Sequence, residues 1–377
     1  MRAKTKMIHG GITGDEQTGA VSVPVYQVST YKQDGVGNHR GFEYSRTGNP
    51  TRHALETVIA ELENGEVGFA FGSGMAAITS VMMLFDAGDH VVMTDDVYGG
   101  SYRLMTKVLN RYNLDHSFVD TSYPEKVEAS ITEKTKALYI ETPTNPLLKI
   151  TDLEKMAEIA KKHDLLLIVD NTFATPYWQQ PLDFGADIVL HSATKYIGGH
   201  SDVVAGLVVV NSDELAEQLH FIQNSVGAVL GPQDSWLLMR GIKTLAIRME
   251  AIEANTQKLV AFLQSHEKVS NIYYPGLEEH RGHEIAAKQA SGHGGMISFD
   301  VGSGELAEKV LQRVKYFTLA ESLGAVESLI SLPAKMTHAS IPADRRADLG
   351  ITDGLIRVSV GIEDHEDLIE DLKQALE

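Results

Sequence analysis

The stretches LLLIVD at 165–170 and ADIVLHSATKYIGG at 186–199 decide the fold of this chain. Each begins with a short apolar run rich in Val, Ile and Leu, the composition of a strand buried on both faces of a sheet. Polar residues end both runs, with Asp170 in the first and Ser192 in the second. In α/β sheets, ligands bind at the carboxyl ends of the strands. The two stretches therefore predict neighbouring strands of a mostly parallel sheet, with a functional site where they end.

Comparable apolar runs precede and follow this pair along the chain. They are GFAF (68–71), HVVMTD (90–95), HSFVD (116–120), KALYIET (136–142) and VVAGLVVV (203–210). The segments between them, such as DLEKMAEIAKKH (152–163), repeat apolar residues at three- and four-residue spacing, which is typical of amphipathic helices. This alternation predicts an α/β fold, with a mostly parallel sheet flanked by helices.

The pattern changes near both ends of the chain, and the changes predict three regions. Residues 1–45 mix Gly, Thr and Gln with short β-rich pieces such as AVSVPVYQVSTY (20–31), so we expect an arm rather than a domain. Residues 46–232 hold the alternating pattern and form the predicted large domain. Residues 233–377 form a predicted smaller α+β domain, which opens with a long helical stretch at 235–266 and ends in a C-terminal helix.

Composition excludes several classes of function. The 377 residues carry 33 Lys and Arg against 51 Asp and Glu, a net charge of −18, which argues against nucleic acid or an anionic membrane as the main partner. The absence of cysteine excludes disulfides, iron–sulfur clusters, thiolate zinc sites and cysteine nucleophiles. The N-terminus has no signal-peptide pattern, and no apolar run approaches the ~20 residues that span a bilayer. We therefore expect a cytoplasmic protein that acts on a small molecule.

A glycine-rich turn at 72–77 satisfies the dinucleotide pattern G-x-G-x-x-A, and an acidic pair follows at Asp95 and Asp96. The physical basis of this pattern is less specific than its name, because small residues at a strand-to-helix turn let backbone amides approach any phosphate. A nicotinamide-dependent oxidoreductase and a non-catalytic binding protein are therefore open alternatives at this point.

Lys195 lies in HSATKYIGGHSD, between two runs that are typical of buried strands. An unpaired lysine there is costly unless it has a function. A lysine amine with a lowered pKa can condense with an aldehyde, and a carboxylate such as Asp170 can hold a pyridinium nitrogen. Ser192 and Thr194, with Gly74 at a predicted helix start, are candidates for binding a phosphate. Together these residue types indicate a site for an aldehyde, a ring nitrogen and a phosphate.

Several blocks of sequence, taken in order, resemble one known family. They are YSRTGNPT (44–51), GSGMAA (72–77), DDVYGG (95–100), ETPTNP (141–146), VDNTF (169–173), HSATKYIGGHSD (191–202), ESLGAVESL (321–329), MTHAS (336–340) and IRVSVGIED (356–364). With these blocks, nearly the whole chain resembles the cysteine- and methionine-metabolism family of pyridoxal-phosphate enzymes. The resemblance implies fold type I, pyridoxal 5′-phosphate as cofactor and an amino acid as substrate.

The resemblance also implies how the cofactor would be held. Lys195 would bind its aldehyde covalently and later move protons between substrate carbons, Asp170 would pair with the ring nitrogen, and Tyr98 would stack on the ring. The residues implied to bind the phosphate are Gly74, Met75, Ser192 and Thr194. Tyr44 and Arg46 match residues that the family lends to the neighbouring subunit's phosphate. We therefore expect a catalytic dimer, and a homotetramer made of two such dimers.

The same resemblance places the substrate. Arg357 matches the family's clamp for the substrate carboxylate, which a bidentate guanidinium binds well, with Asn145 and Ser322 in support. Glu321 precedes the clamp serine, and Arg103 is expected on the distal side; a carboxylate there can hold the second amino group of cystathionine. We therefore expect γ-elimination of L-cystathionine, with side activity as a cysteine desulfhydrase and β-lyase.

Alternatives within and outside the family remain. Cystathionine γ-synthase and cystathionine β-lyase share most of the apparatus, whereas methionine γ-lyase carries a cysteine where this chain has Gly100. Histidines in EEHRGHE (278–284) resemble metal ligands, as do His191 and His200, but no zinc pattern such as H-E-x-x-H is completed. A serine hydrolase is not favoured, because the chain lacks a G-x-S-x-G elbow at 72–74.

Overall fold

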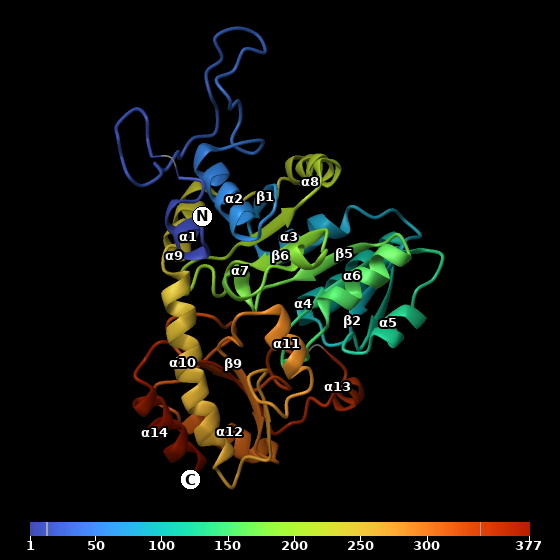
Figure 1. Cartoon of the computed structure of the whole chain (residues 1–377), viewed down its shortest axis with the longest axis vertical. Helices are drawn as coiled ribbons and strands as arrows, with labels where there is room; N and C mark the ends of the chain where they lie inside the picture. The colour runs from blue at the N-terminus through green and yellow to red at the C-terminus, as the bar shows by residue number, and fades with distance from the viewer. Residues whose placement is uncertain (13, 340) are drawn as a thin grey trace.

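The computed structural model describes residues 1–12, 14–339 and 341–377. Ser340, the last residue of the MTHAS block, lies outside the described residues. In Figure 1 the first two thirds of the chain form the upper part of the molecule, and the last third forms the lower part. Helix α10 (Leu245–Gln264) runs from one part into the other. Over the described residues, no helix is both long and apolar enough to cross a bilayer.

The upper part is built on a sheet whose strands, over the described residues, follow the order β1-β7-β6-β5-β4-β2-β3. The strands are β1 (Val67–Phe71), β2 (His90–Thr94), β3 (Asp115–Val119), β4 (Thr135–Glu141), β5 (Leu166–Asp170), β6 (Ile188–Ser192) and β7 (Gly206–Val210). Strands β3, β2, β4, β5 and β6 are parallel, and β7 is antiparallel to both β6 and β1. Each predicted apolar run of this region is a strand, so the prediction of a mostly parallel sheet is confirmed.

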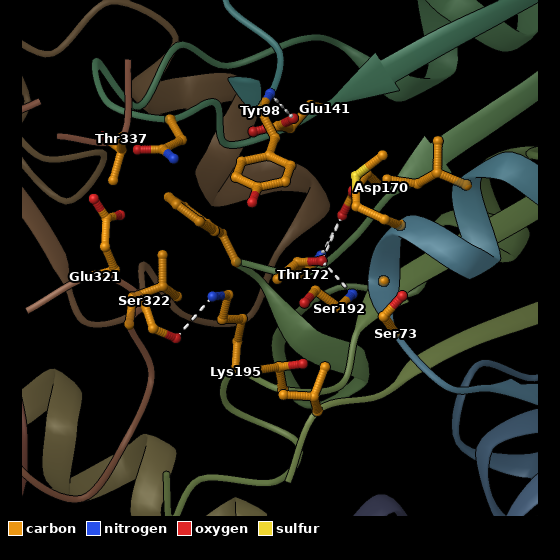
Figure 2. A pocket seen from close by; sticks show the side chains of 18 of the residues that line it. Ser73, Tyr98, Glu141, Asp170, Thr172, Ser192, Lys195, Glu321, Ser322 and Thr337 are labelled. Atoms are coloured by element: carbon orange, nitrogen blue, oxygen red, sulfur yellow. Dashed lines mark hydrogen bonds between the residues drawn. The ribbon is translucent and has the colours of Figure 1, made fainter. Parts of the chain in front are cut away.

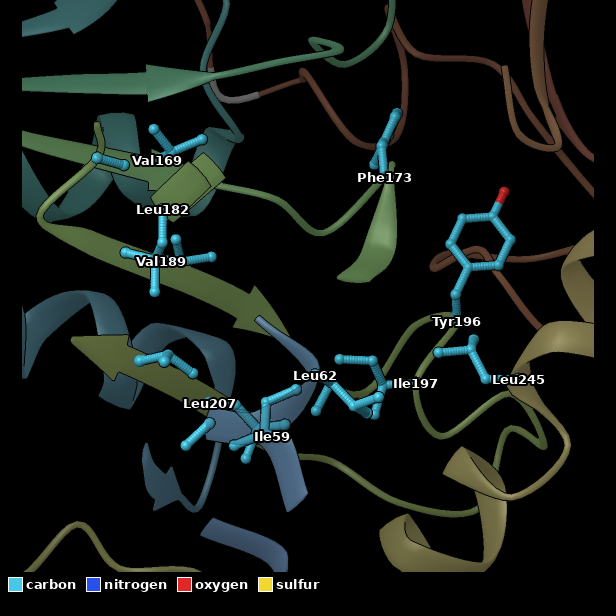
Figure 3. Packing of buried hydrophobic residues seen from close by; sticks show 14 of the residues in the cluster. Ile59, Leu62, Val169, Phe173, Leu182, Val189, Tyr196, Ile197, Leu207 and Leu245 are labelled. Atoms are coloured by element: carbon cyan, nitrogen blue, oxygen red, sulfur yellow. The ribbon is translucent and has the colours of Figure 1, made fainter. Parts of the chain in front are cut away.

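Both faces of this sheet are buried, as continuous apolar strands require. Alternate residues of one strand enter different core clusters: Leu138 and Ile140 of β4 face one cluster, and Tyr139 between them faces the other. Figure 3 shows the first cluster, where strand residues such as Leu207 lie near Ile59 of a covering helix. The helices of this part are α2 (Pro50–Leu62), α3 (Gly74–Met82), α4 (Gly99–Arg103), α5 (Pro124–Ala129), α6 (Leu153–Lys162), α7 (Thr175–Trp178) and α8 (Asp213–Val226), with a π-helical turn at Leu104–Val108 and 3-10 turns at Leu109–Tyr112 and Pro181–Phe184.

The lower part holds a second, mainly antiparallel sheet, with strand order β10-β11-β12-β9-β8 over the described residues. The strands are β8 (Asn271–Tyr273), β9 (Met296–Asp300), β10 (Thr318–Leu319), β11 (Leu329–Ser331) and β12 (Leu355–Ser359). Its further helices are α11 (His283–Gln289), α12 (Gly304–Arg313), α13 (Ala343–Leu349) and α14 (His365–Leu376). A separate apolar cluster joins β9 and β12 to α10, α12 and α14.

The long helical stretch predicted at 235–266 is two helices, α9 (Pro232–Ile242) and α10. The break lies at Thr244, whose backbone leaves the helical conformation with φ −110° and ψ 4°. One turn into α10, Arg248 Nη2 donates to the Gly241 carbonyl at 2.9 Å and Nη1 donates to the Tyr196 carbonyl at 2.6 Å. The break thus lets a buried guanidinium satisfy carbonyls of α9 and of the turn that follows Lys195.

The N-terminal region has little regular structure. It begins with helix α1 (Ala3–His9), and the β-rich pieces near 20–31 form no strand among the described residues. Among the described residues of this region, the β pairing consists of isolated bridges such as Thr30 with Tyr44. In Figure 1 the dark-blue loops project away from the rest of the molecule.

Candidate active site

A cavity of about 340 Å³ lies where the carboxyl ends of β4, β5 and β6 meet the start of α3 and loops of the lower part (Figure 2). It brings together most of the residues that the sequence predicts for the site. These are Gly74, Met75, Tyr98, Asn145, Asp170, Ser192, Thr194, Lys195, Glu321, Ser322 and Arg357. The topology explains the meeting, because parallel strands place all their carboxyl ends at one edge of the sheet.

Three predicted residues do not line the cavity. Arg103 is exposed at the end of α4, more than one helical turn beyond Tyr98, so the cavity lining gives its expected distal position no support. Tyr44 and Arg46 lie in the arm, where the Arg46 guanidinium sits 5.5 Å from the Tyr44 ring centroid and Tyr44 is 46% exposed. Both arm residues are therefore free to meet another molecule rather than their own cavity.

Lys195 lies three residues after the end of β6, and its Nζ donates to Ser322 Oγ at 2.7 Å. Burial, and then the positive charge of Arg357, lower the pKa of Lys195 to about 8, against the opposing carboxylate of Glu321. A substantial fraction of this amine is therefore unprotonated at mildly alkaline pH. That is the state in which a lysine can attack a carbonyl carbon.

Asp170 ends β5 and is held by its neighbours. Its Oδ1 accepts from the backbone N–H of Thr172 at 3.0 Å and from the Thr172 hydroxyl at 2.6 Å, while Oδ2 accepts from the Tyr139 hydroxyl at 3.3 Å. Burial raises the pKa of Asp170, and the two bonds from Thr172 counteract that rise. A carboxyl placed in this way favours a cationic partner in the cavity, such as a protonated ring nitrogen.

A second carboxyl, that of Glu141, ends β4 directly beside Asp170. Glu141 Oε2 accepts from the backbone N–H of Tyr98 at 2.9 Å, so it fixes the residue whose ring extends into the cavity (Figure 2). Burial and the nearby charge of Asp170 raise the pKa of Glu141 well above its usual range. The sequence alone gives Glu141 no role, although Glu141 opens the ETPTNP block and ends its strand just as Asp170 does.

The start of α3 forms the cradle for an anion. Ser73 caps the helix by accepting from the Ala76 N–H at 3.0 Å, which leaves further backbone amides of the first turn unpaired within the helix. Gly74 packs so closely on Ser192 that a Cβ there would lie 3.0 Å from the Ser192 side chain. Backbone N–H groups and the hydroxyls of Ser192 and Thr194 thus line one end of the cavity, as binding of a phosphate requires.

Arg357 lies on β12 and is almost fully buried. Its Nη1 donates to Asn145 Oδ1 at 3.0 Å and its Nη2 donates to the Ser322 carbonyl at 2.9 Å. Burial lowers its pKa to about 10, so the guanidinium stays protonated near neutral pH. Among the described atoms its Nε has no partner, and a bound carboxylate would supply one.

The structure explains two further features of the sequence. A Cβ at Gly100 would lie 2.4 Å from the Tyr98 ring and 2.6 Å from Met75 Sδ, so a larger residue here would displace the ring.

The histidines with metal-like spacing make other bonds: His191 Nε2 bonds to the buried Glu63, and His280 and His283 donate to backbone carbonyls. No group of three or more potential ligands able to hold a metal occurs in the described part of the chain.

Residues 4–377 match the family of Cys/Met metabolism PLP-dependent enzymes. The chain belongs to this family. It is 71% identical over 377 residues to a cystathionine gamma-lyase of Bacillus subtilis, covering all of both chains, and 62% identical over 374 residues to a cystathionine beta-lyase of Lactococcus lactis, covering 99% of this chain and 98% of that relative. The crystal structure of a cystathionine gamma-lyase from Lactobacillus plantarum, complexed with L-serine, matches with a TM-score of 0.98 and 52% identity, covering 100% of this chain and 98% of that one.

Family membership confirms the predicted fold, the pyridoxal-phosphate cofactor and the lyase class of the enzyme. The cavity itself fits the cofactor, because it offers an amine of lowered pKa at Lys195, a buried carboxyl at Asp170 and a cradle of backbone amides at Gly74. Because the family is one of pyridoxal-phosphate enzymes, the nicotinamide alternative for the glycine-rich turn at 72–77 is set aside.

Proposed function

We propose that this enzyme is a cystathionine γ-lyase, which converts L-cystathionine and water to L-cysteine, 2-oxobutanoate and ammonia. The observation that carries the proposal is the place of Glu321 in the cavity, next to Ser322, which accepts from Lys195. A carboxylate there can pair with the second ammonium group of cystathionine, which shorter amino acids lack. The Bacillus subtilis relative bears the same name and matches over its full length.

Substrate binding follows from the chain's own groups. Arg357 presents a planar fork to the substrate's α-carboxylate, and Asn145 holds one arm of that fork in place. Glu321 attracts the distal ammonium, so the two ends of the substrate are fixed and its carbon chain crosses the cavity near Lys195. This positioning brings the reacting carbons within reach of the lysine amine.

Bound pyridoxal phosphate supplies an electron sink, which makes protons next to the substrate nitrogen removable. Lys195 Nζ accepts the proton from Cα, and a second proton then leaves Cβ, with Lys195 and Tyr98 as the groups placed to accept it. The electron pair of that Cβ–H bond expels sulfur from Cγ, and the leaving thiolate takes a proton to become cysteine. Asp170 would hold the ring nitrogen in its protonated state, and Tyr98 is fixed by Glu141.

The test measures both products of holoenzyme incubated with L-cystathionine. γ-Elimination yields 2-oxobutanoate, whereas β-elimination yields pyruvate, and we expect 2-oxobutanoate to predominate. Borohydride reduction of the resting enzyme should attach the cofactor to the peptide that contains Lys195, and Lys195→Ala should lose the visible absorption and nearly all turnover. Pyruvate as the main product, or full activity in Lys195→Ala, would refute the proposal.

Cystathionine γ-synthase is the second candidate, because relatives with that name also match over almost the whole chain. One is a 52% identical protein of Mycobacterium leprae, and another is the Xanthomonas oryzae pv. oryzae structure in complex with aminoacrylate and cysteine, at 45% identity and a TM-score of 0.97. We expect kcat/KM for cystathionine cleavage to exceed that for joining an activated homoserine ester to cysteine. A clear preference for the ester would assign the enzyme to the synthases.

The proposal includes a homotetramer of two catalytic dimers in the cytoplasm. Support for the assembly comes from the arm, where Val21, Val25, Val28 and Val36 are exposed in the single chain. Apolar side chains gathered on one projecting segment are typical of a surface that another molecule covers. Light scattering of the holoenzyme should give about four times the chain mass of 41.2 kDa, and a monomer at working concentration would contradict the assembly.

A further inference from the structure

The MTHAS block contains a buried histidine to which the mechanism above gives no task. His338 is fully buried, and both of its ring nitrogens make hydrogen bonds. Its Nε2 lies 2.9 Å from the backbone carbonyl oxygen of Asn145, and its Nδ1 lies 2.8 Å from Thr337 Oγ1. Thr337 in turn lines the cavity that holds Lys195.

These two partners settle which nitrogen of His338 carries the proton. A carbonyl oxygen can only accept, so Nε2 must be the protonated nitrogen that donates to Asn145. Burial, and then the nearby charge of Arg357, lowers the pKa of His338 to about 4, so the ring is neutral under working conditions and Nδ1 carries a lone pair. The hydroxyl of Thr337 must therefore donate its single proton to Nδ1.

This hydrogen bond to His338 limits what the Thr337 hydroxyl can offer to a ligand. A hydroxyl has one proton and two lone pairs, and the proton of Thr337 is already used. Toward the cavity its oxygen can only accept. Glu321, another acceptor, lines the same cavity, and Figure 2 shows the two residues on the side opposite Asp170. A ligand group between two acceptors must supply N–H donors, as an ammonium group does.

The same histidine ties this acceptor to the carboxylate clamp. Asn145 accepts from His338 through its backbone oxygen and from Arg357 Nη1 through its side-chain oxygen at 3.0 Å. One residue thus connects the Thr337 acceptor to the guanidinium that binds the α-carboxylate. The separation of these two recognition points is fixed by hydrogen bonds that run from the half-buried Thr337 through the buried His338, Asn145 and Arg357.

We propose that Thr337 is a specificity-determining residue that accepts from the distal ammonium group of the substrate, and that His338 is the positioning residue that holds the Thr337 hydroxyl in this acceptor-only state. The ligand class is an amino acid with a second ammonium group at its far end, such as a diamino dicarboxylic thioether. The choice of that substrate rests on the proposed function; the hydrogen-bond state of Thr337 and His338 does not.

The first experiment measures discrimination between two substrates. For each holoenzyme, kcat/KM is measured with L-cystathionine and with L-homocysteine, which has no distal ammonium group. Thr337→Val keeps the shape of the side chain but removes the acceptor, and should lower the cystathionine-to-homocysteine ratio by about tenfold or more, since a hydrogen bond to a charged group is lost. Thr337→Ser is the matched control, because it keeps the hydroxyl and should keep the ratio within about threefold.

An unchanged ratio in Thr337→Val, or an equal fall for both substrates, would overturn the specificity role. This failure is distinct from failure of the proposed function, which would appear as wild-type enzyme that makes no 2-oxobutanoate from cystathionine. His338→Gln, whose amide can still donate to Asn145, should retain more of the ratio than His338→Leu. Equal ratios in those two variants would contradict the positioning role.

The second experiment needs no turnover. Solid-state NMR of holoenzyme labelled with ¹⁵N-histidine reports which ring nitrogen carries the proton, and the His338→Gln spectrum identifies the signal. We expect a neutral ring protonated at Nε2, with Nδ1 shifted when Thr337→Val removes its hydrogen-bond donor. A proton on Nδ1, or a doubly protonated ring at neutral pH, would overturn the acceptor-only assignment whatever the enzyme's substrate.

Discussion

Lys195 is reactive because of the groups that surround it, not because of its residue type alone. Burial and Arg357 lower its pKa to about 8, while the carboxylate of Glu321 raises it. The two charged neighbours are also the residues proposed to hold the two ends of the substrate. The groups that bind substrate thereby set the protonation state of the amine that acts on it.

This arrangement predicts a pair of opposite shifts in cofactor-free protein. Reductive methylation requires a neutral amine, so modification of Lys195 should increase as pH rises through about 8, below the range of ordinary lysines. Arg357→Gln removes a positive charge and should move the midpoint to higher pH, whereas Glu321→Gln removes a negative charge and should move it lower. Peptide mapping by mass spectrometry gives each midpoint, and shifts of the same sign in both variants would contradict the electrostatic account.

Glu141 predicts a pH-dependent stability. Its pKa in the folded protein is raised by burial and by Asp170, so the folded state binds a proton that the unfolded chain releases above its ordinary pKa of 4.5. The contribution of Glu141 to the free energy of unfolding is therefore fully present below pH 4.5. It falls as pH rises toward the folded pKa, by up to about 1.4 kcal/mol per pH unit. Glu141→Gln cannot ionise and should lose less stability than wild type between pH 5 and 8.

Denaturant unfolding of cofactor-free protein at several pH values measures this difference. The gap between Glu141→Gln and wild type should widen steadily as pH rises. Glu133→Gln, at an exposed position, is the matched control, and its gap from wild type should not widen with pH. A gap that is constant with pH would show that Glu141 is already ionised in the folded protein.

At the residue scale, sequence patterns located the reactive groups but not the residues that support them. Lys195, Asp170 and Arg357 stand in blocks of recognisable order, and the structure brings them to one cavity. Glu141 and His338 also stand in such blocks, but their roles could not be predicted, because those roles depend on partners far away in the chain. His338 meets Asn145 across 193 positions, and local spacing cannot reveal such a pair.

At the scale of elements, the strands were predictable and the helix boundaries were less so. Strands such as β5 and β6 are buried on both faces, so their apolar runs are continuous and easy to recognise. The break between α9 and α10 leaves no clear mark, because apolar periodicity continues through Thr244. Its cause is tertiary: the Arg248 guanidinium needs carbonyl partners from Gly241 and Tyr196.

The start of α3 supports a prediction about cofactor binding. Gly74→Ala would place a Cβ 3.0 Å from the Ser192 side chain and force that side chain to shift. Since both residues line the proposed phosphate site, cofactor affinity should fall by about tenfold, or about 1.4 kcal/mol. Equilibrium dialysis with pyridoxal phosphate gives the dissociation constant.

Asp152→Ala is the control for a general loss of stability. Asp152 caps α6 by accepting from the Lys155 N–H at 3.1 Å and lies outside the cavity lining. Its loss should cost about 1 kcal/mol of unfolding free energy and leave cofactor affinity unchanged. If both variants weakened the cofactor equally, the effect of Gly74→Ala would reflect destabilisation rather than the cradle.

At the scale of the whole molecule, the two sheets occupy separate stretches of the chain, and the domain division at residue 232 stays a prediction. The arm is the part that sequence reasoning described least well. Its composition is β-rich, yet a strand needs a partner, and among the described residues this segment makes isolated bridges such as Thr30 with Tyr44. Composition alone cannot reveal whether such a partner belongs to the same chain or to another.

The position of Tyr44 and Arg46 predicts that each active site is shared between two subunits. Neither residue lines its own cavity, and both are exposed in the single chain, at the junction of the arm and the large domain. If Arg46 completes the phosphate site of a neighbour, Arg46→Ala should be inactive because it binds the cofactor weakly. Lys195→Ala should be inactive because it lacks the reactive amine. Mixing the two inactive proteins then provides a direct test.

In a mixed dimer, one site combines Lys195 from the Arg46→Ala subunit with Arg46 from the Lys195→Ala subunit, and it is intact. The other site carries both defects. Random exchange makes about half of the dimers mixed, so about a quarter of wild-type activity should return after the variants are unfolded together and refolded. Refolding each variant alone is the control and should restore nothing. If the mixture stays inactive although both chains refold with wild-type yield, each subunit must build its site alone, and the arm must serve assembly only.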